Sequence, residues 1–318
     1  MIAATVLGGL LLLWIGGEAF VRGSVAVAER LNVSQLMIGL TLVAFGTSLP
    51  ELVTSLAAVF EGAPGLSVGN VVGSNIANVL LILGIAALIR PVICRPDAFY
   101  RDAVALGIAT AVATIMILIG HLGRAHGLIL LAGLVVYLAV IYRKERIQPG
   151  PAGRVLAGEA QAAHPAPTTL PFALFLVVVG LAGVVGGAWM LVSGATELAL
   201  IWGVSRTFMG LTIVAVGTSL PELVITSVAS FRGRSDVALG NIMGSNMFNL
   251  LAILGITAIV TPINVPPALR VIDLAVMVAA TALLIVVAAT RMQVARWEGA
   301  GFLFAYVVYT IVRSSIAL

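Results

Sequence analysis

Charge is scarce in this sequence. Only 9% of its 318 residues are Asp, Glu, Lys or Arg, whereas soluble domains carry roughly 25%. Hydrophobic residues make up 61% of the chain, and the mean hydropathy is +1.16. Such a chain cannot cover itself with polar groups in water, which excludes a secreted protein, a cytosolic enzyme and a partner of nucleic acid. The composition indicates a polytopic helical membrane protein in a lipid bilayer, because each span takes about 20 apolar residues.

Cysteine and histidine are rare as well. The single cysteine, Cys94, cannot form an internal disulfide, and it lies beside Arg90 in a short predicted loop, where we do not expect a catalytic thiol. Three histidines fall in predicted loops, where we expect them to be solvated: His121, His126 and His164. Outside loop positions, the chain therefore offers no histidine or cysteine ligand for zinc, copper or iron, and no cofactor is expected.

Apolar runs, separated by prolines and charges, divide the chain into ten segments. These are residues 2–28, 35–60, 67–89, 98–120, 125–143, 171–201, 207–231, 237–261, 268–289 and 297–316. Most prolines fall between segments, where breaking a helix costs little. The predicted fold class is an all-α polytopic membrane protein with ten transmembrane helices.

Most of the 17 basic residues fall on one side of the predicted membrane. This side holds Arg30, Arg90, Arg95, Arg101, Arg143, Lys144, Arg146, Arg154, Arg232, Arg234, Arg291 and Arg296. By the positive-inside rule, the side richer in basic residues is cytoplasmic. We therefore expect a multi-pass protein of the cell (inner) membrane, with both termini outside and the central linker in the cytoplasm.

The chain contains two copies of one pattern. Residues 46–53 read Gly-Thr-Ser-Leu-Pro-Glu-Leu-Val, and residues 217–224 repeat all eight at an offset of 171. Residues 69–78, which include Gly-Ser-Asn-x-x-Asn, recur at the same offset as residues 240–249. Such long matches at a constant offset indicate a duplication. We predict a first repeat over residues 1–143, a cytoplasmic linker over 144–170 and a second repeat over 171–318.

Each copy holds five predicted spans, so the two copies must cross the membrane in opposite directions. Inverted repeats place a substrate site near the bilayer midplane, on interrupted helices. Pro50 and Pro221 fall inside the second and seventh segments, where proline removes a backbone donor and kinks a helix. The sequence therefore predicts two inverted five-helix repeats, each with a broken helix at its first motif.

One glutamate in each copy lies deep in an apolar segment. An ionised Glu51 or Glu222 is costly there unless it is paired, and no lysine or arginine lies at a matching depth in the same segments. A bound cation is the simplest compensation. Oxygen-bearing side chains fall at helical spacing around both glutamates. The predicted cation ligands are Thr47, Ser48, Glu51, Ser74, Asn78, Thr218, Ser219, Glu222, Ser245 and Asn249.

The chemistry of these ligands narrows the choice of ion. Carboxylate, amide and hydroxyl oxygens are hard ligands that suit calcium, sodium or a similar ion. The second motif also carries Gly-x-x-x-Gly at Gly69 and Gly73, and at Gly240 and Gly244, which favours close helix approach. A polar network that only locks the helices together is the structural alternative. Two carboxylates without a basic partner argue against it, because each needs a proton or a cation.

The paired motifs resemble the α-repeats of the calcium/cation antiporter superfamily, and within it the prokaryotic sodium/calcium exchanger branch. The proton-coupled branch usually has Asn-Ala-x-Glu in its first motif, which this sequence lacks. The resemblance covers the whole chain and implies ten spans with both ends outside. The linker has no room for the calcium-sensing insert of eukaryotic relatives.

The resemblance implies that Glu51 and Glu222 are the main calcium ligands, with sodium or calcium contacts from the hydroxyls. It also implies that Asn78 and Asn249 line the centre. Many relatives, including potassium-dependent exchangers, have aspartate where this sequence has Asn249, which argues against potassium co-transport. The implied function is secondary active exchange of Na⁺ for Ca²⁺ by alternating access, with these ions as substrates and no obligate protein partner.

Three other functions stay open on the residues alone. A proton-coupled calcium/cation antiporter would use the same glutamates as proton sites. An intramembrane enzyme would need a nucleophile or activated water and usually a metal-binding histidine, and none lies in the spans. A passive channel would not require a carboxylate from each half.

Glycine marks the two segments that we expect to move or to pack closely. The first and sixth segments contain Gly16, Gly17, Gly23, Gly186, Gly187 and Gly194. Either these helices slide across the core, or the glycines serve tight packing only. The sequence leaves open the exchange stoichiometry and the roles of Glu18 and Glu197.

Overall fold

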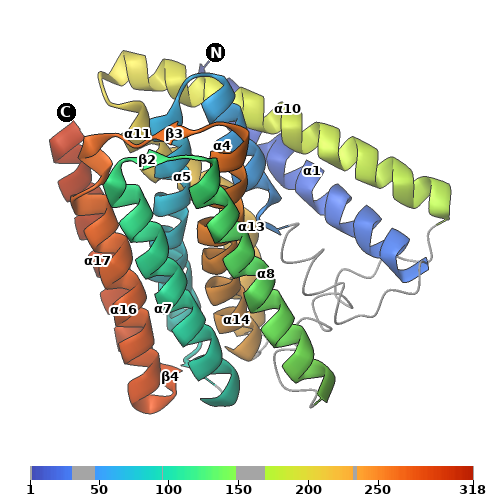
Figure 1. Ribbon diagram of the computed structural model, residues 1–318, viewed down its shortest axis with the longest axis vertical. Coiled ribbons are helices and arrows are strands. Elements are labelled where there is room, and N and C mark those ends of the chain that lie inside the picture. The colour runs from blue at the N-terminus through green and yellow to red at the C-terminus, as the bar shows by residue number, and fades with distance from the viewer. Residues whose placement is uncertain (1, 31–46, 95, 148–168, 232–234, 318) are drawn as a thin grey trace.

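The computed structural model describes residues 2–30, 47–94, 96–147, 169–231 and 235–317. Helices dominate, and most of them stand side by side in an upright bundle (Figure 1). Within these residues, eight helices are long and apolar enough to cross a membrane, and a ninth span results if one bent helix pair is counted as a single span. The predicted polytopic helical membrane protein is therefore confirmed.

The helices occupy the predicted segments to within a few residues. The first half contains α1 (Ile2–Arg30), α4 (Leu49–Phe60), α5 (Pro64–Ile76), the π-helix η2 (Ala77–Ile82), α6 (Leu83–Ile89), α7 (Pro96–Ile119) and α8 (Arg124–Ile147). The second contains α10 (Leu170–Trp202), α11 (Arg206–Met209), the π-helix η3 (Gly210–Val214), α12 (Ala215–Thr218), α13 (Leu220–Phe231), α14 (Ser235–Met247), the π-helix η4 (Phe248–Ile253), α15 (Leu254–Val260), the 3₁₀ turn η5 (Pro267–Leu269), α16 (Ile272–Arg291) and α17 (Arg296–Ala317). Residues 35–46 of the second predicted segment lie outside the described residues.

Helix ends follow the breakers in the sequence. Pro50, Pro64 and Pro171 stand in the first turns of α4, α5 and α10, where the missing N–H would have no intrahelical partner anyway. Gly62 and Gly203, just beyond α4 and α10, both have φ of 67°. Glycine reaches this left-handed conformation without the strain of a side chain.

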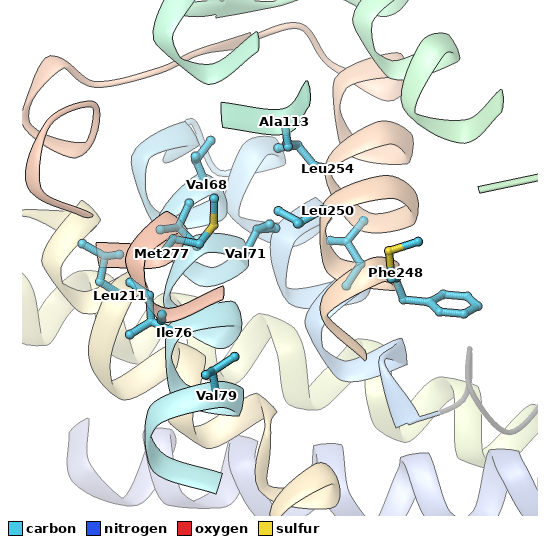
Figure 2. Packing of buried hydrophobic residues seen from close by; sticks show 14 of the residues in the cluster. Val68, Val71, Ile76, Val79, Ala113, Leu211, Phe248, Leu250, Leu254 and Met277 are labelled. Atoms are coloured by element: carbon cyan, nitrogen blue, oxygen red, sulfur yellow. The ribbon is translucent and has the colours of Figure 1, made fainter. Parts of the chain in front are cut away.

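The second motif of each copy lies in the most shielded helices. The span Pro64–Ile89 is 78% buried and Ala238–Val260 is 83% buried, whereas the other candidate spans are 22–44% buried. Figure 2 shows Val68 and Val71 of α5 close to Leu250 of η4 and Met277 of α16. These helices form the centre of the bundle, and the others separate them from lipid.

Helices α1 and α10 form a separate layer, inclined to the bundle (Figure 1). A Cβ atom added at Gly16 would lie 2.7 Å from the Val184 nitrogen, and one at Gly187 would lie 2.7 Å from the Gly9 oxygen. The two backbones therefore touch, as small residues permit between membrane helices. We call this contact the glycine seam. It consists of Gly9, Gly16 and Gly23 on α1 and Gly180, Gly187 and Gly194 on α10.

Two short strand pairs connect loops of the two halves. Strand β1 (Val92–Ile93) pairs with β4 (Gln293–Val294), and β2 (His121–Leu122) pairs with β3 (Ile263–Asn264), both antiparallel. Figure 1 places β4 at the opposite end of the bundle from β2 and β3, and both chain ends on the side of β2 and β3. Each end of the bundle is thus tied across the halves.

Several polar residues lie elsewhere than predicted or gain a partner. His126 is in the first turn of α8 rather than in a loop. Its Nδ1 accepts a hydrogen bond at 3.2 Å from the N–H of Gly123, the residue that precedes the helix, which is how a side chain three residues later caps a helix start. His121 is exposed as predicted, and His164 lies outside the described residues. Glu18 pairs with Arg22 one turn away on α1, at 2.6 Å between Oε1 and Nε.

An acidic residue near the start of α7 and of α16 is neutralised by arginine. Asp102 Oδ1 lies 2.7 Å from Arg101 Nε. Asp273, fully buried, has Oδ1 3.0 Å from Arg313 Nε and accepts a hydrogen bond from the Tyr309 hydroxyl at 3.0 Å. Among the described residues, neither Glu51 nor Glu222 pairs with an arginine or lysine, so their burial needs a different explanation.

Candidate ion-binding site

The first motif of the second copy lies at a helix break. Helix α12 ends at Thr218, α13 begins at Leu220, and the helices on either side meet at 44°. Ser219 between them has φ −83° and ψ 10°. The break therefore lies two residues before Pro221, which stands in the first turn of the new helix, where a proline is well tolerated.

The first copy has the same local geometry where it is described. Ser48, which precedes α4, has φ −89° and ψ 6°, close to the values at Ser219. Pro50 again stands in the first turn of the helix that follows. Both glutamates are thus in the first turn of a helix, where the N-terminal end of the helix dipole favours negative charge.

The two breaks bring the glutamates of the two halves together. Glu51 and Glu222 are each 1% exposed. The Ser219 hydroxyl donates to Glu51 Oε1 at 3.0 Å, and the Ser48 hydroxyl donates to Glu222 Oε1 at 3.5 Å. Each serine precedes the glutamate of its own half by three residues, so the two motifs face one another across the interface between the halves.

The second motif lies against this pair. The Ser245 hydroxyl donates to Glu222 Oε1 at 3.4 Å, and the Ser74 hydroxyl donates to the Ala215 carbonyl at 3.4 Å. Asn78 Nδ2 donates to Asn246 Oδ1 at 3.0 Å, which joins the two halves directly. All ten predicted ligands are buried: Thr47, Ser48, Glu51, Ser74, Asn78, Thr218, Ser219, Glu222, Ser245 and Asn249.

Four oxygen atoms of the predicted ligands have no hydrogen-bond donor among the described residues. They are Glu51 Oε2, Glu222 Oε2, Asn78 Oδ1 and Asn249 Oδ1. Buried polar atoms without a partner are rare and unfavourable. Carboxylate and amide oxygens are the ligands that hard cations such as Ca²⁺ prefer. The arrangement can therefore hold a hard cation that satisfies these oxygens.

The described residues contain no group of three or more His, Cys, Asp or Glu side chains that could hold a metal ion. The negative charge of the candidate site therefore comes from two carboxylates only, with neutral hydroxyls and amides around them. Glu197, the other glutamate that the sequence left open, is exposed on α10.

Sequence reasoning missed part of the polar network around the site. Asn70 bonds to the backbone of Glu51, and Asn246 Nδ2 donates to the Asn75 carbonyl at 3.3 Å. Asn241 Nδ2 donates to Thr226 Oγ1 at 2.9 Å. Their constant offset between the copies was an available signal, because amides are costly in apolar helices without a partner.

Nothing in the sequence indicated the three π-helices η2, η3 and η4, and two of these correspond between the copies. These two lie at equivalent places: η2 begins at Ala77, directly after α5, and η4 begins at Phe248, directly after α14. The second residue of each is an asparagine, Asn78 or Asn249, that we predicted to line the centre of the ion site. Short π-helical turns inside α-helices frequently occur at functional sites.

A bundle of apolar helices that buries carboxylates beside helix breaks has the architecture of a secondary transporter. The chain belongs to the sodium/calcium exchanger protein family, whose model matches residues 1–143 and 172–314. Members of this family are transporters rather than enzymes.

Individual relatives cover almost the full chain. The putative antiporter CaxA of Alkalimonas amylolytica is 38% identical over 315 residues, which are 97% of this chain and 98% of that protein. The sodium/calcium exchanger MaX1 of Methanosarcina acetivorans is 32% identical, with 96% of each chain covered. Among solved structures, the sodium-calcium exchanger NCX_Mj soaked with Na⁺ and Sr²⁺ matches with a TM-score of 0.63 and 33% identity, covering 97% of this chain and 98% of that chain.

Proposed function

We propose that this chain is a secondary active antiporter that exchanges Na⁺ for Ca²⁺ across the membrane by alternating access. The observation that carries the proposal is the reciprocal contact of the two halves: Ser219 donates to Glu51, and Ser48 donates to Glu222. Each carboxylate keeps an oxygen without a donor among the described residues. Two carboxylates balance one Ca²⁺ or two Na⁺, so the two ions compete for one site.

The proposed ligands are the ten predicted residues. Glu51 and Glu222 supply the charge, and Asn78 and Asn249 supply amide oxygens. The remaining ligands are hydroxyls: Thr47, Ser48, Ser74, Thr218, Ser219 and Ser245. Ca²⁺ takes about 6–8 oxygen ligands in flexible geometry. The ten residues provide enough oxygens for Ca²⁺, and Na⁺ can bind to some of the same oxygens.

We further propose ten spans in two inverted repeats, residues 1–143 and 171–318, joined by a cytoplasmic linker over 144–170. The constant offset of the motifs supports this, and so do the equivalent π-helices η2 and η4. The strand pairs also support two related halves, since each pair joins a loop of one half to a loop of the other. The distribution of arginine and lysine favours both termini outside the cell membrane.

Coupling follows from the cost of an empty site. Two bare carboxylates in an apolar core are strongly unfavourable, so the molecule changes its accessible side only when cations are bound. Helices α1 and α10 are the proposed moving layer. At Gly17, which lies on α1, an added Cβ atom would be 3.8 Å from Pro50 Cγ, so α1 passes directly over the helix break that carries Glu51.

A proton-coupled calcium/cation antiporter is the second candidate, because two buried carboxylates that have no arginine or lysine partner in the described part of the chain can also take up protons. ⁴⁵Ca²⁺ uptake by purified protein in proteoliposomes distinguishes the sodium-coupled from the proton-coupled function. The proteoliposomes are loaded to impose either a Na⁺ gradient or a pH gradient. The proposal expects uptake with the Na⁺ gradient alone. Uptake that responds to the pH gradient and ignores sodium would replace it with the proton-coupled function.

A further inference from the structure

Asn70 lies one layer behind the proposed ligands and contacts both halves. It is fully buried on α5. Its Nδ2 donates to the backbone carbonyl of Glu51 at 3.2 Å and to Ser55 Oγ at 3.0 Å, both on α4. Its Oδ1 accepts a hydrogen bond from the Thr218 hydroxyl, on α12 of the other half, at 3.2 Å.

These partners fix the direction of the amide. An amide side chain has two N–H donors on one side and an acceptor oxygen on the other. The Glu51 carbonyl can only accept, so Nδ2 must face α4. Oδ1 is then turned toward Thr218, and from that position it can accept a hydrogen but cannot donate one.

The direction of the amide in turn fixes the Thr218 hydroxyl. A hydroxyl has one hydrogen and two lone pairs, and a cation ligand must point a lone pair at the ion. The hydrogen of Thr218 is directed to Asn70 Oδ1 and to the Ala215 carbonyl, which lies 3.3 Å away. Both groups only accept, so the lone pairs of Thr218 stay available for a cation.

Glycines bring Asn70 within reach of the other half. A Cβ atom added at Gly69 would lie 2.7 Å from the backbone carbonyl oxygen of Thr207, and one at Gly73 would lie 2.6 Å from that of Leu211. The backbone of α5 therefore rests directly on α11 and η3, the segments that lead into α12. This confirms the predicted close approach at the first Gly-x-x-x-Gly. At Gly240 and Gly244 no described atom lies within 4 Å of such a Cβ.

The second half repeats the anchor of this amide. Asn241 Nδ2 donates to Thr226 Oγ1 at 2.9 Å, and these two residues stand 171 positions after Asn70 and Ser55. The residue that corresponds to Thr218 by the same offset is Thr47. The arrangement of an asparagine anchored to the broken helix is thus present twice.

We propose that Asn70 is a positioning residue of the ion site: it orients the Thr218 hydroxyl of one half while it holds the backbone at Glu51 of the other. Asn241 has the same role toward Thr47. The proposal rests on the proposed function only in taking Thr218 and Thr47 as cation ligands. Partners behind the direct ligands typically change metal affinity about 10–100-fold when they are removed.

A double-mutant cycle on the full chain tests the proposal. Ca²⁺ affinity is measured in detergent from the dependence of the melting temperature on Ca²⁺ concentration, for wild type, Asn70→Ala, Thr218→Val and the double variant. Asn70→Ala should weaken Ca²⁺ binding about 10–100-fold. In the Thr218→Val background the effect should be several-fold smaller, because no hydroxyl is left to orient and only the loss at the Glu51 backbone remains.

Asn75→Ala is the matched control. Asn75 is buried on the same helix, but its Nδ2 donates to the Val71 carbonyl of that helix at 2.7 Å. Alanine keeps the Asn75 backbone carbonyl that accepts from Asn246, so the substitution should leave Ca²⁺ affinity unchanged. Equal effects of Asn70→Ala in both backgrounds would overturn the proposal and leave Asn70 a purely structural role. If Asn70→Ala does not fold, the cycle is run with Asn241→Ala and Thr47→Val, since Asn241 is only partly buried.

The proposed function can fail separately. The cycle reads Ca²⁺ binding and needs no transport, so a wild type that binds Ca²⁺ without sodium-driven uptake would contradict the coupling ion and leave the role of Asn70 testable. A wild type without any Ca²⁺-dependent stabilisation would contradict both.

Discussion

The hydroxyl contacts of the two buried carboxylates differ in length. Ser219 Oγ lies 3.0 Å from Glu51 Oε1, whereas Ser48 and Ser245 lie 3.5 and 3.4 Å from Glu222 Oε1. Hydroxyl–carboxylate hydrogen bonds are strongest at about 2.5–2.7 Å. Among the described hydroxyl contacts, Glu51 therefore has one shorter bond and Glu222 has two longer ones, although the residues around them correspond between the copies.

This difference predicts unequal effects of equivalent substitutions. Ser219→Ala removes the shorter bond and should weaken Ca²⁺ binding about 10-fold or more, since a hydrogen bond to a charged group contributes about 1.5–3 kcal/mol. Ser48→Ala also removes a proposed ligand but should weaken Ca²⁺ binding less than Ser219→Ala does, because its 3.5 Å contact with Glu222 is near the limit of a hydrogen bond and Ser245 remains. Melting curves at increasing Ca²⁺ concentrations measure both. A larger effect of Ser48→Ala would contradict the account.

The sequence is enough to single out the residues that we propose as ion ligands, but it misses those that we propose to act through another residue. Glu51 and Glu222 stand out because a charge in an apolar run needs an explanation in any fold. Asn70 does not stand out in the same way, because its role depends on Thr218, which lies 148 residues away in the chain. Such a relation appears only once the two halves are in contact.

At the scale of helices, hydropathy predicts where a helix lies and misses its internal geometry. The break at the first motif could be predicted to within two residues, because Pro221 forces it. The π-helix η2, with sequence Ala-Asn-Val-Leu-Leu-Ile, is as apolar as the α-helix on either side and gives no separate pattern. The strands β1 to β4 contain two residues each, which is too short for the alternation that marks a strand.

The glycine seam between α1 and α10 provides a prediction with a neighbouring control. At Gly187 an added Cβ atom would lie 2.7 Å from the Gly9 oxygen and from the Leu13 nitrogen, whereas at Gly186 the nearest described atom is Leu12 Cδ2 at 3.6 Å. Gly187→Ala should therefore separate the helices, destabilise the protein by about 1–3 kcal/mol, as overpacking does, and reduce transport. Gly186→Ala should have little effect on either.

Thermal melting in detergent and ⁴⁵Ca²⁺ flux in proteoliposomes measure the two consequences. A Gly187→Ala protein that melts and transports like wild type would mean that the two helices can move apart without cost. Equal losses in both variants would mean that helix flexibility matters rather than the close contact.

At the scale of the whole molecule, the strand pairs and the layer of α1 and α10 have different structural roles. The pairs β1–β4 and β2–β3 tie loops of both halves at opposite ends of the bundle. Helices α1 and α10 lie beside that bundle and contact each other through backbone. This division is consistent with a rigid core that holds the site and a layer that moves across it.

The orientation of the chain in the membrane can be tested with single cysteines. Ser315→Cys should react with a membrane-impermeant maleimide on intact cells, and Ala157→Cys should react only after the membrane is opened, because the termini are proposed to lie outside and the linker inside. The native Cys94 should not be labelled by the maleimide. It is buried, and burial, with a contribution from Glu298, raises the pKa of its thiol to about 12, so almost no thiolate is present at neutral pH to react.

The opposite labelling pattern would reverse the orientation deduced from the arginines. Labelling of both positions on intact cells would contradict the odd number of spans in each half, and with it the inverted repeat. The wild-type chain, unlabelled before denaturation and labelled in SDS, is the control for Cys94.

Sodium-driven ⁴⁵Ca²⁺ uptake by Glu51→Gln and Glu222→Gln proteins in proteoliposomes tests the central claim most directly. Each variant should lose transport by about 100-fold or more, because removing one partner of a buried charge pair costs about 3–5 kcal/mol and each 1.4 kcal/mol is a factor of ten. Glu298→Gln is the matched control and should transport normally, since Glu298 Oε2 accepts the Ala295 N–H at 2.7 Å at the start of α17, and a glutamine oxygen can accept the same bond. Normal uptake by both Glu51→Gln and Glu222→Gln would contradict the claim that these two carboxylates bind the transported ions.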